Sequence, residues 1–366
     1  MWIQALVPAM TVAFVVTVAF MLTLHPLAVK IGLVDRPGGR KLHNGSVPIV
    51  GGIAMFAGMA TGALLLGLPT VGFLSALVAG LLLVLVGAID DGITLPPSAR
   101  VIAQIAVVLI MIYGGTLQLA DIGDPFGTGV ISMGRFSVIF TLVVSLTMIN
   151  AYNLVDGIDG LAGSLAIVAL VAVSVVAGLD SVFGIAALTV VASIVGFLLF
   201  NFPVKWNRSQ RSFMGDAGST LLGLAIVWLT IGISQGAERV ISPVHCLWFA
   251  ALPIFDCLTC FVRRSLKGKS PFTPGRDHFH HTLRRGGFRV RQRLGIIVGL
   301  QMLYAAIGIY GYYAGVPDPI MFAAWSALGL SQRRIIRMIA KSHRLHRLKL
   351  IRAHELLAKR NETAHT

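Results

Sequence analysis

The stretch Asn150-Ala-Tyr-Asn-Leu-Val-Asp-Gly-Ile-Asp-Gly160 stands between two long apolar runs, at residues 133–150 and 160–178. Each run is long enough to cross the hydrocarbon core of a bilayer as a helix. Polar side chains at the end of such a run cost free energy unless they are paired, so they are candidates for function. The polar side chains of this stretch are Asn150, Asn153, Asp156 and Asp159. They predict a membrane protein with a polar site at one membrane face.

The composition of the whole chain supports this interpretation. Of its 366 residues, 56% are hydrophobic and only 12% are charged, and the mean hydropathy is +0.82. Soluble domains do not have such a composition. Because a bilayer offers no water to unpaired backbone groups, the chain must cross it as helices or as a closed barrel, and continuous apolar runs favour helices. We therefore predict an all-α polytopic membrane protein.

About eleven apolar runs have roughly the length of a transmembrane helix. They lie at residues 3–24, 49–67, 71–89, 99–114, 133–150, 160–178, 181–200, 218–235, 244–262, 294–313 and 316–330. No basic residue precedes the first run, which indicates a span with a periplasmic N-terminus rather than a cleavable signal peptide. An odd number of spans then places the C-terminus in the cytoplasm.

The distribution of basic residues supports this orientation. The segments on the predicted inside contain all of the 30 Lys and Arg residues except Arg135 and Arg239. This satisfies the positive-inside rule and predicts a protein of the cell inner membrane whose polar site faces the cytoplasm. The net charge of +15 is thus explained by the membrane, whose lipids attract basic segments, and we expect no nucleic-acid partner.

The chain divides into two predicted parts. Residues 1–330 form a transmembrane catalytic domain with its active site at the cytoplasmic face, and residues 331–366 form a basic cytoplasmic tail. The tail is predicted to be a partly amphipathic helix at the surface of anionic lipids.

Asp90 and Asp91 directly follow the third apolar run. A helix carries negative partial charge at its C-terminus, so two carboxylates are unfavourable there. They cannot act as N-terminal caps in this position. A bound cation or a positively charged partner would relieve the repulsion, which makes the pair a candidate for chemistry.

The other Asp residues have a structural alternative. Asp156 or Asp159 could cap the helix that starts near Gly160, but one cap needs only one carboxylate. Asp216, in the segment Phe213-Met-Gly-Asp-Ala-Gly-Ser219, could also be an N-cap. A helix start lined by Gly and Ser is equally a place where phosphate binds, and an Asp there could hold a metal ion that bridges to the phosphate.

Two inside loops combine basic residues with turn residues. The first contains Lys41 and His43 among several glycines, which is compatible with an anion cradle or with a plain positive-inside loop. In the longest loop stand Arg276, His278, His280 and His281. Imidazole and guanidinium groups suit phosphate oxygens. Zinc is the alternative for the histidines, but no cysteine or fourth ligand stands at a suitable spacing.

The apolar run 244–262 contains three further reactive side chains. Cys257 and Cys260 form a C-x-x-C pair, but they are expected on one face of a lipid-embedded helix, where a redox or zinc role lacks access. Asp256 is interpreted as a buried and paired structural group.

Five carboxylates are therefore expected on one membrane face, with basic and His-containing loops around them: Asp90, Asp91, Asp156, Asp159 and Asp216. Mg²⁺ binds one or two carboxylates together with substrate phosphates and water, and it neutralises pyrophosphate oxygens during phosphoryl transfer. The pattern predicts a site for phosphoryl transfer assisted by Mg²⁺, with Mn²⁺ as the alternative ion.

These clusters, in this order, resemble the polyprenyl-phosphate N-acetylhexosamine-1-phosphate transferases of glycosyltransferase family 4. The resemblance covers residues 1 to about 330. Its motifs are Lys41-x-His43 with Pro48 and Gly51-Gly52, Asp90-Asp91, Asn153-Leu-Val-Asp156-Gly-Ile-Asp159-Gly, Phe213-Met-Gly-Asp216-Ala-Gly-Ser, and His278-x-His280-His281. Members of the family have about ten or eleven transmembrane helices and a cytoplasmic active site.

The resemblance implies a reaction in which a polyprenyl phosphate attacks the β-phosphate of a UDP-N-acetylhexosamine and UMP leaves. It implies that Asp216 and Asp159, with Asp156 beside them, bind Mg²⁺, and that Asp90 and Asp91 serve the attacking lipid phosphate. By the same resemblance the donor-binding residues are Lys41, His43, Asn153, Gly157, Asn201, Phe213, Arg276, His278, His280 and His281. The expected partners are undecaprenyl phosphate, the sugar nucleotide and membrane lipids; a homodimer stays open.

Details of the motifs favour one branch of the family. The interrupted His-x-His-His loop is similar to that of the bacterial N-acetylglucosamine-1-phosphate transferases, whose products start cell-surface polysaccharides such as O-antigen. The muramoyl-pentapeptide branch typically has three consecutive histidines, whereas Phe279 interrupts them here. Close relatives often continue the Asp-Asp pair to a third Asp, but Thr94 stands in the segment after Asp91, so no metal role is expected there.

Other interpretations of the same residues remain. The donor could be another UDP-N-acetylhexosamine or UDP-MurNAc-pentapeptide. An aspartate-rich membrane prenyltransferase also uses Asp clusters and Mg²⁺, but with different spacing and without the His–Arg loop. A transporter would need polar residues near the middle of several spans, whereas here they gather at one face. For the transferase we expect direct attack by the lipid phosphate, because a phosphate monoester with a second pKa near about 6 is largely dianionic at pH 7. A covalent aspartyl intermediate is the alternative.

Overall fold

The computed structural model describes residues 2–35, 46–67, 71–204, 210–236, 239–268 and 278–364, the last part of which is described by its backbone alone. The longer helices are α1 (Trp2–Ile31), α3 (Val71–Ile93), α5 (Ser137–Val155), α7 (Val182–Asn201), α8 (Gly215–Ser234), α12 (Val290–Tyr313) and α13 (Asp318–Ala364). The shorter ones are α2 (Gly51–Leu65), α4 (Pro97–Leu109), α6 (Leu161–Ala177), α9 (Pro243–Cys246), α10 (Ala251–Ser265) and α11 (Phe279–Arg285).

Short irregular turns and one small hairpin complete these elements. The π-helical turn η1 (Ile110–Gly114) continues α4, and the 3₁₀ turns η2 (Gly134–Phe136) and η4 (Leu247–Ala250) precede α5 and α10. Strands β1 (Val34–Asp35) and β2 (Val47–Pro48) pair antiparallel. At the end of β2, the Pro48 carbonyl accepts the Phe213 N–H at 2.8 Å. This contact holds the end of the first loop against the segment before α8.

The helices confirm the predicted all-α polytopic membrane fold. Among the described residues, eight helical segments are long and apolar enough to cross a membrane. The helices α2 and α6 are apolar but shorter, and the last predicted span is the first part of α13. Every predicted span thus contains a helix, while the exact number of crossings and the orientation of the termini stay predictions.

Several predicted boundaries were wrong because sequence alone underestimates how far a helix continues beyond its apolar part. Helix α5 continues to Val155, so Asn150 and Asn153 lie on its last turns rather than in a loop. Helix α3 passes Asp90 and Asp91 and ends at Ile93. The predicted division at residue 330 does not interrupt the helix, since α13 is continuous from Asp318 to Ala364.

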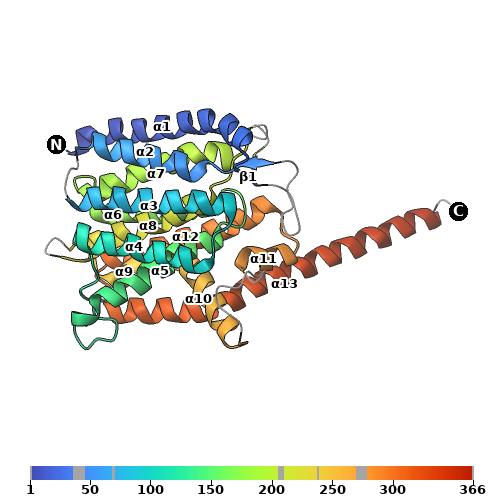
Figure 1. Cartoon of the computed structure of the whole chain (residues 1–366). Coiled ribbons are helices and arrows are strands. Elements are labelled where there is room, and N and C mark those ends of the chain that lie inside the picture. Colours follow the sequence, from blue (N-terminus) through green and yellow to red (C-terminus); the bar gives the residue numbers. More distant parts are fainter. Residues whose placement is uncertain are drawn as a thin grey trace.

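The helices form a bundle of roughly parallel rods, from which the end of α13 projects (Figure 1). Helix α1 lies at one side of the bundle with α2 and α7, and α13 runs along the opposite side (Figure 1). Helix α8 contacts α2, α3, α5, α6, α7 and α9, and its residues from Ala217 to Ser234 are almost all buried. The bundle is therefore organised around α8.

Small residues let the other helices approach α8 closely. A Cβ atom added to Gly52 of α2 or to Gly87 of α3 would collide with backbone atoms of Gly218 or Ala217. In lipid, where water does not drive helices together, such close contact between backbones is a main source of attraction. These glycines bring α2 and α3 to the first turn of α8, where the polar residues gather.

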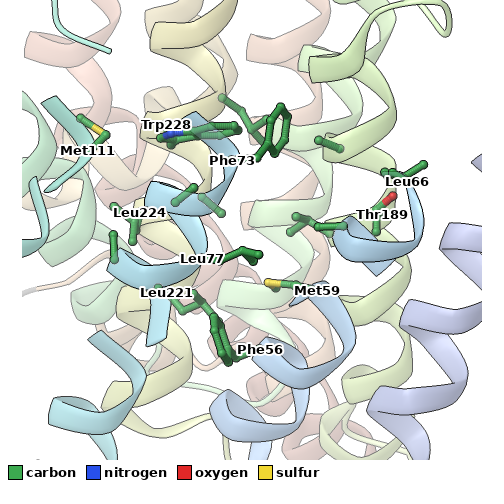
Figure 2. Close-up of a pocket in the computed structure, with 18 residues that line it drawn as sticks. Phe56, Met59, Leu66, Phe73, Leu77, Met111, Thr189, Leu221, Leu224 and Trp228 are labelled. Carbon is green, nitrogen blue, oxygen red and sulfur yellow. The ribbon is translucent and has the colours of Figure 1, made fainter. Parts of the chain in front are cut away.

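An apolar cavity of about 90 Å³ lies between α2, α3, α7 and α8 (Figure 2). It is lined by aromatic and aliphatic side chains, with Thr189 as the polar exception. The ring centroids of Phe73 and Trp228 stand 4.8 Å apart in an edge-to-face contact. A cavity with this lining cannot stabilise a charged substrate, so the functional site lies elsewhere in the described chain.

The close approach of α5 to α8 gives a test of this packing. A Cβ atom added to Gly223 would lie 2.6 Å from Cα of Ile149, which requires the two helices to move apart. We expect Gly223→Ala to lower the apparent melting temperature in detergent by several degrees, an effect typical of overpacking. As a control, Gly299→Ala has open space around the new methyl group and should leave the melting temperature unchanged or slightly raised. Equal melting temperatures for both variants would contradict this account.

Candidate active site

Two adjoining cavities open around the first turn of α8. The first, of about 350 Å³, includes Asp90, Arg100 and Asn153, and the second, of about 710 Å³, includes Asp156, Asp159 and Phe213. Four residues line both: Gly157, Asp216, His280 and His281. Residues of four of the five sequence motifs, those of Asp90, Asn153, Phe213 and His278, thus meet in one composite site.

Asp91 is tied to the first turn of α8. Its carboxylate accepts the N–H of Asp216 at 2.9 Å and the N–H of Ala217 at 3.4 Å. Gly215 has a φ of +70°, and a Cβ atom there would collide with the Asp91 carboxylate. A carboxylate is favourable at the positive end of a helix dipole. Asp91 therefore has a structural partner that its position in the sequence did not predict.

Asp90 has the positively charged partner that its position requires. Its Oδ2 lies 3.2 Å from Nη1 of Arg100, at the start of α4, and its Oδ1 accepts the N–H of Leu95. Arg100 lies 3.4 Å from Oδ2 of Asp216 as well. One guanidinium thus bridges the carboxylates of α3 and α8, and it relieves the repulsion at the end of α3.

Asp216 lies in the first turn of α8, but the predicted N-cap role is wrong. Met214 occupies the N-cap position, and it makes no hydrogen bond from its side chain to the helix. Instead, Oδ1 of Asp216 accepts a hydrogen bond from Asn153 of α5 at 2.8 Å. Asn153 also donates to Ser219 at 3.1 Å. Asp216 is therefore held by α4 and α5 at the boundary between the two cavities.

The predicted capping of α6 by Asp156 or Asp159 is also wrong. Gly160 is the N-cap residue, with a φ of +78° and no capping hydrogen bond from a side chain. Asn201 of α7 accepts the Gly160 N–H at 2.7 Å and donates to the Ser212 carbonyl at 2.9 Å. An Asn from another helix thus satisfies this turn and leaves both carboxylates available for other partners.

Asp159 and Asp156 differ in their partners. Asp159 forms an ion pair with Arg211, whose guanidinium carbon lies 5.0 Å from the centroid of the Phe213 ring. Among the residues that the structure describes, Asp156 forms no ion pair. Burial, and then the negative charges of Asp216, Asp159 and Asp91, raise the pKa of Asp156 to about 7. A cation beside Asp156 would stabilise its ionised form.

The carboxylates suit Mg²⁺, although they do not form a closed cage. Among the described residues, Asp156, Asp159 and Asp216 do not bring three ligand oxygens within 4.8 Å of one another. Mg²⁺ needs oxygen ligands and usually takes only one or two from protein carboxylates, with the rest from water and phosphate. Asp156, Asp159 and Asp216 all line the second cavity, and the charges of Asp216 and Asp159 both act on Asp156.

Two buried side chains of α10 contact the imidazole of His278. Its Nδ1 lies 3.0 Å from Oδ2 of Asp256 and 3.6 Å from Sγ of Cys260. Burial alone would lower the pKa of His278, but the hydrogen bonds with Asp256 and Cys260 raise this pKa to about 10. His278 lines the first cavity, so the site presents a cationic imidazole there. The interpretation of Asp256 as a buried, paired group is confirmed.

Contrary to the prediction that no cysteine stands near the histidines, Cys260 lies beside His278, 18 residues away in sequence. Asp256, Cys260 and His278 bring their ligand atoms within 4.8 Å of one another. Cys260 was expected on a lipid-embedded helix face, but it is buried against the segment before α11. The trio offers three ligands among the described residues, whereas structural zinc sites have four.

His280 has a different environment from His278. It is buried against Gly157, where a Cβ atom would collide with the imidazole ring. Burial, and then the positive charges of His281, His278 and Arg293, lower the pKa of His280 well below its usual value. His280 is therefore neutral at pH 7. Gly157 is explained by the space that this ring needs, in addition to its predicted contact with the donor.

Some predicted residues cannot be placed, and some lining residues were missed. Lys41, His43 and Arg276 lie outside the described residues. The missed lining residues are Asp35, Arg100, Gln104, Arg211, Arg284 and Arg293. The sequence did contain a signal for Arg100. It stands at the start of the helix that follows Asp90-Asp91, and those carboxylates need a cationic partner. Arg293 lies within the helix α12 and carries no motif.

Most of the site residues lie in the part of the chain that matches a known family. Residues 73–234, from α3 to α8, match the family described as Glycosyl transferase family 4. A protein of Yersinia pestis named undecaprenyl-phosphate alpha-N-acetylglucosaminyl 1-phosphate transferase is 37% identical over 313 residues, which cover 85% of this chain and 86% of that protein. Proteins of the same name from Escherichia coli (strain K12) and Pasteurella multocida (strain Pm70) are 36% and 35% identical over 84% and 87% of this chain, and over 84% and 90% of their own lengths.

The contact between His278 and Asp256 predicts a pH dependence of stability. Because the pKa of His278 is raised from its ordinary 6.5 to about 10, the contact stabilises the fold fully below pH 6.5 and progressively less as the pH rises toward 10. We expect the apparent melting temperature in detergent to fall between pH 7 and pH 10. His278→Gln should lower it at pH 7 and flatten this fall, whereas His346→Gln, an exposed control, should keep the wild-type profile. Parallel profiles for wild type and His278→Gln would contradict the assignment.

Proposed function

The chain belongs to glycosyl transferase family 4, and from this premise we propose that it is a membrane phosphotransferase that acts on undecaprenyl phosphate. It transfers N-acetylglucosamine 1-phosphate from UDP-GlcNAc and gives undecaprenyl-pyrophosphoryl-GlcNAc and UMP. The observation that carries the proposal is the pair of cavities that meet at Asp216, one partly apolar and one polar. The names of the relatives that align over most of the chain support the substrate.

The first cavity suits the phosphate of a lipid. Apolar residues of α3 and α4, including Leu83, Val86 and Val101, line it together with Asp90 and Arg100. A prenyl chain would lie against the apolar part and its phosphate against the Arg100 guanidinium, which offers several donors to phosphate oxygens. We assign this cavity to the acceptor.

The second cavity suits the nucleotide diphosphate. It combines an aromatic ring, Phe213, with the guanidinium groups of Arg211, Arg284 and Arg293. An aromatic face can stack on uracil, and guanidinium groups bind phosphate oxygens in pairs of hydrogen bonds. Asn201 lines the same cavity but is already bonded to Gly160 and Ser212, so we give it a positioning role for the loop before α6.

Mg²⁺, or Mn²⁺ in its place, would be held by Asp216 and Asp156, with Asp159 nearby. When bound, the ion supplies neutralisation of the pyrophosphate oxygens and of the charge that develops on the leaving UMP. The chain contributes the carboxylates that hold the ion and the bonds that orient them. Arg100 and Asn153 fix Asp216 on two sides.

The arrangement favours direct attack. A phosphate monoester with a second pKa near about 6 is largely dianionic at pH 7, so a strong general base is not needed. Asp90, oriented by Arg100, would hold the lipid phosphate and its residual proton in line with the β-phosphate of the donor. His278, kept cationic by Asp256, adds positive charge beside the new pyrophosphate. A phosphorylated, nucleotide-free enzyme formed from donor alone would instead indicate a covalent intermediate.

We also propose an inner-membrane protein whose site faces the cytoplasm, where sugar nucleotides are made. In this orientation residues 115–132 face the periplasm and the end of α10 faces the cytoplasm. The three native cysteines are free and buried, so they should not react with the reagent, and labelling reports on the introduced cysteine. A membrane-impermeant maleimide should label Thr128→Cys in intact cells and Lys267→Cys only after lysis. Labelling of Lys267→Cys in intact cells would overturn the orientation.

The reaction is tested by release of UMP from UDP-GlcNAc, in the presence of undecaprenyl phosphate and Mg²⁺. We expect release to need all three components, to be lost with EDTA, and to be faster with UDP-GlcNAc than with UDP-GalNAc or UDP-MurNAc-pentapeptide. A preference for one of the other donors would transfer the proposal to that sugar. No release with any of them would overturn the proposed reaction.

Two variants separate the proposed roles of the carboxylates. Asp90→Asn should lower kcat by about 10²-fold with little change in the KM for UDP-GlcNAc, because it acts on the attacking phosphate. Asp159→Asn should raise the KM for the donor and the Mg²⁺ requirement about tenfold. Asp121→Asn is a matched control, since Asp121 pairs with Arg239 in a different loop. Equal effects on both constants in both variants would contradict the division.

A further inference from the structure

A third polar cavity, of about 380 Å³, lies between the end of α10, helix α11 and helix α13. It does not share residues with the two cavities of the active site. Six basic side chains line it together with Thr282, Gly286 and Ala340: Arg263, Arg285, Arg333, Arg337, Lys341 and Arg344. None of its described lining residues is acidic. We call it the basic pocket.

The spacing of the basic residues on α13 places them on one face. Arg333, Arg337, Lys341 and Arg344 follow one another at intervals of four, four and three residues, which is the spacing of neighbours along one side of a helix. Helix α11 turns Thr282 and Arg285 toward the same pocket. Cations therefore converge from three helices.

The helices are packed too closely for these cations to spread apart. A Cβ atom added to Gly286, just after α11, would lie 2.8 Å from Cα of Ala340 in α13, so the two backbones are in contact. The ring centroids of Phe288 and His343 stand 3.9 Å apart in a stacked contact. Burial, and then charges that include those of Arg337 and Arg263, lower the pKa of Arg333. Such crowding is unfavourable unless an anion is bound.

An exposed apolar side chain continues the basic face of α13 toward the predicted membrane. Leu330 lies one turn before Arg333, at the end of the predicted span 316–330, and is 89% exposed. A ligand with a negative head and an apolar body would cover both the cations and this side chain. A free phosphate ion would leave Leu330 uncovered.

We propose that the basic pocket binds the phosphate headgroup of an anionic membrane lipid. Guanidinium and ammonium groups provide charge-assisted hydrogen bonds to its oxygens, and clusters of basic residues at the cytoplasmic end of a membrane helix attract anionic lipids. The lipid's acyl chains lie on the membrane side of the pocket, against Leu330. This site is separate from the proposed substrate cavities, so it stands independently of the transfer reaction.

The pocket also has a mechanical link to the active site. Helix α11 carries His280 and His281 on the side of the two substrate cavities and Thr282 and Arg285 on the side of the basic pocket. A bound headgroup bridges α11 to α13. We therefore expect it to slow amide hydrogen exchange in α11, which reports opening of local structure.

Binding can be measured by native mass spectrometry of the full chain in a neutral detergent, with phosphatidylglycerol as the anionic probe and phosphatidylcholine as the neutral one. We expect selective retention of phosphatidylglycerol. The double variant R337Q/K341Q should weaken it at least about tenfold, since each basic residue near a membrane surface contributes about 1 kcal/mol. The control R334Q/K267Q removes the same charge from exposed residues that do not line the pocket. It should change retention less than about twofold, because solvent screens exposed charges that do not contact the headgroup.

Three results would overturn the proposal. Equal weakening in both double variants would show attraction to net charge rather than a site. Retention of phosphatidylcholine as strong as that of phosphatidylglycerol would show that the headgroup is not recognised. Displacement of the lipid by glycerol 1-phosphate or inorganic phosphate at similar concentration would identify a soluble phosphate as the ligand. The four substituted residues are at the surface, and unchanged melting temperatures would show that both double variants are folded. The single variant Arg344→Gln tests the pocket independently, and it should weaken phosphatidylglycerol retention less than the double variant does.

Discussion

The contact on which the site depends is the one between Asp91 and the start of α8. Helix α8 is the most buried helix of the bundle, and its first N–H groups need acceptors within the protein. Asp91 supplies them from the end of α3, where its own charge is otherwise unfavourable. The positive end of one helix and the carboxylate at the negative end of another therefore stabilise each other. The positions of Asp90 and Asp216 follow from this contact, because Asp90 precedes Asp91 and Asp216 donates one of the two N–H groups.

The rest of the site is a balance of charge within a small space. Arg100 forms ion pairs with both Asp90 and Asp216, and Arg211 forms one with Asp159. The contact with Asp256 stabilises the protonated form of His278. Asp156 forms no ion pair with the described residues, and burial disfavours its ionised form. A site with this balance is prepared for a cation and for phosphate oxygens at once. Transfer of a sugar phosphate between two phosphate esters has this requirement, because one pyrophosphate bond is broken and another is formed while the total negative charge changes little.

The helix α11 lies between the candidate active site and the basic pocket. It is short, and it is held by α13 on one side and by Asp256, through the Phe279 N–H at 3.1 Å, on the other. Its histidines line the cavities of the candidate site, and Arg285 lines the basic pocket. If the pocket binds a lipid as proposed, α11 is the element through which lipid composition would affect the active site.

The sequence by itself determined the membrane fold, the positions of the spans and the polar clusters, because apolar length and the cost of buried charge are properties of local sequence. Asp90-Asp91 could be singled out from the helix dipole alone. The tertiary structure decided the partners: Arg100 for both Asp90 and Asp216, Asn201 instead of Asp156 or Asp159 for the turn at Gly160, and Cys260 beside His278. Each of these pairs joins residues of different helices or loops. Their proximity follows from how closely glycine-containing helices pack around α8, and the periodicity of a single helix does not contain that information.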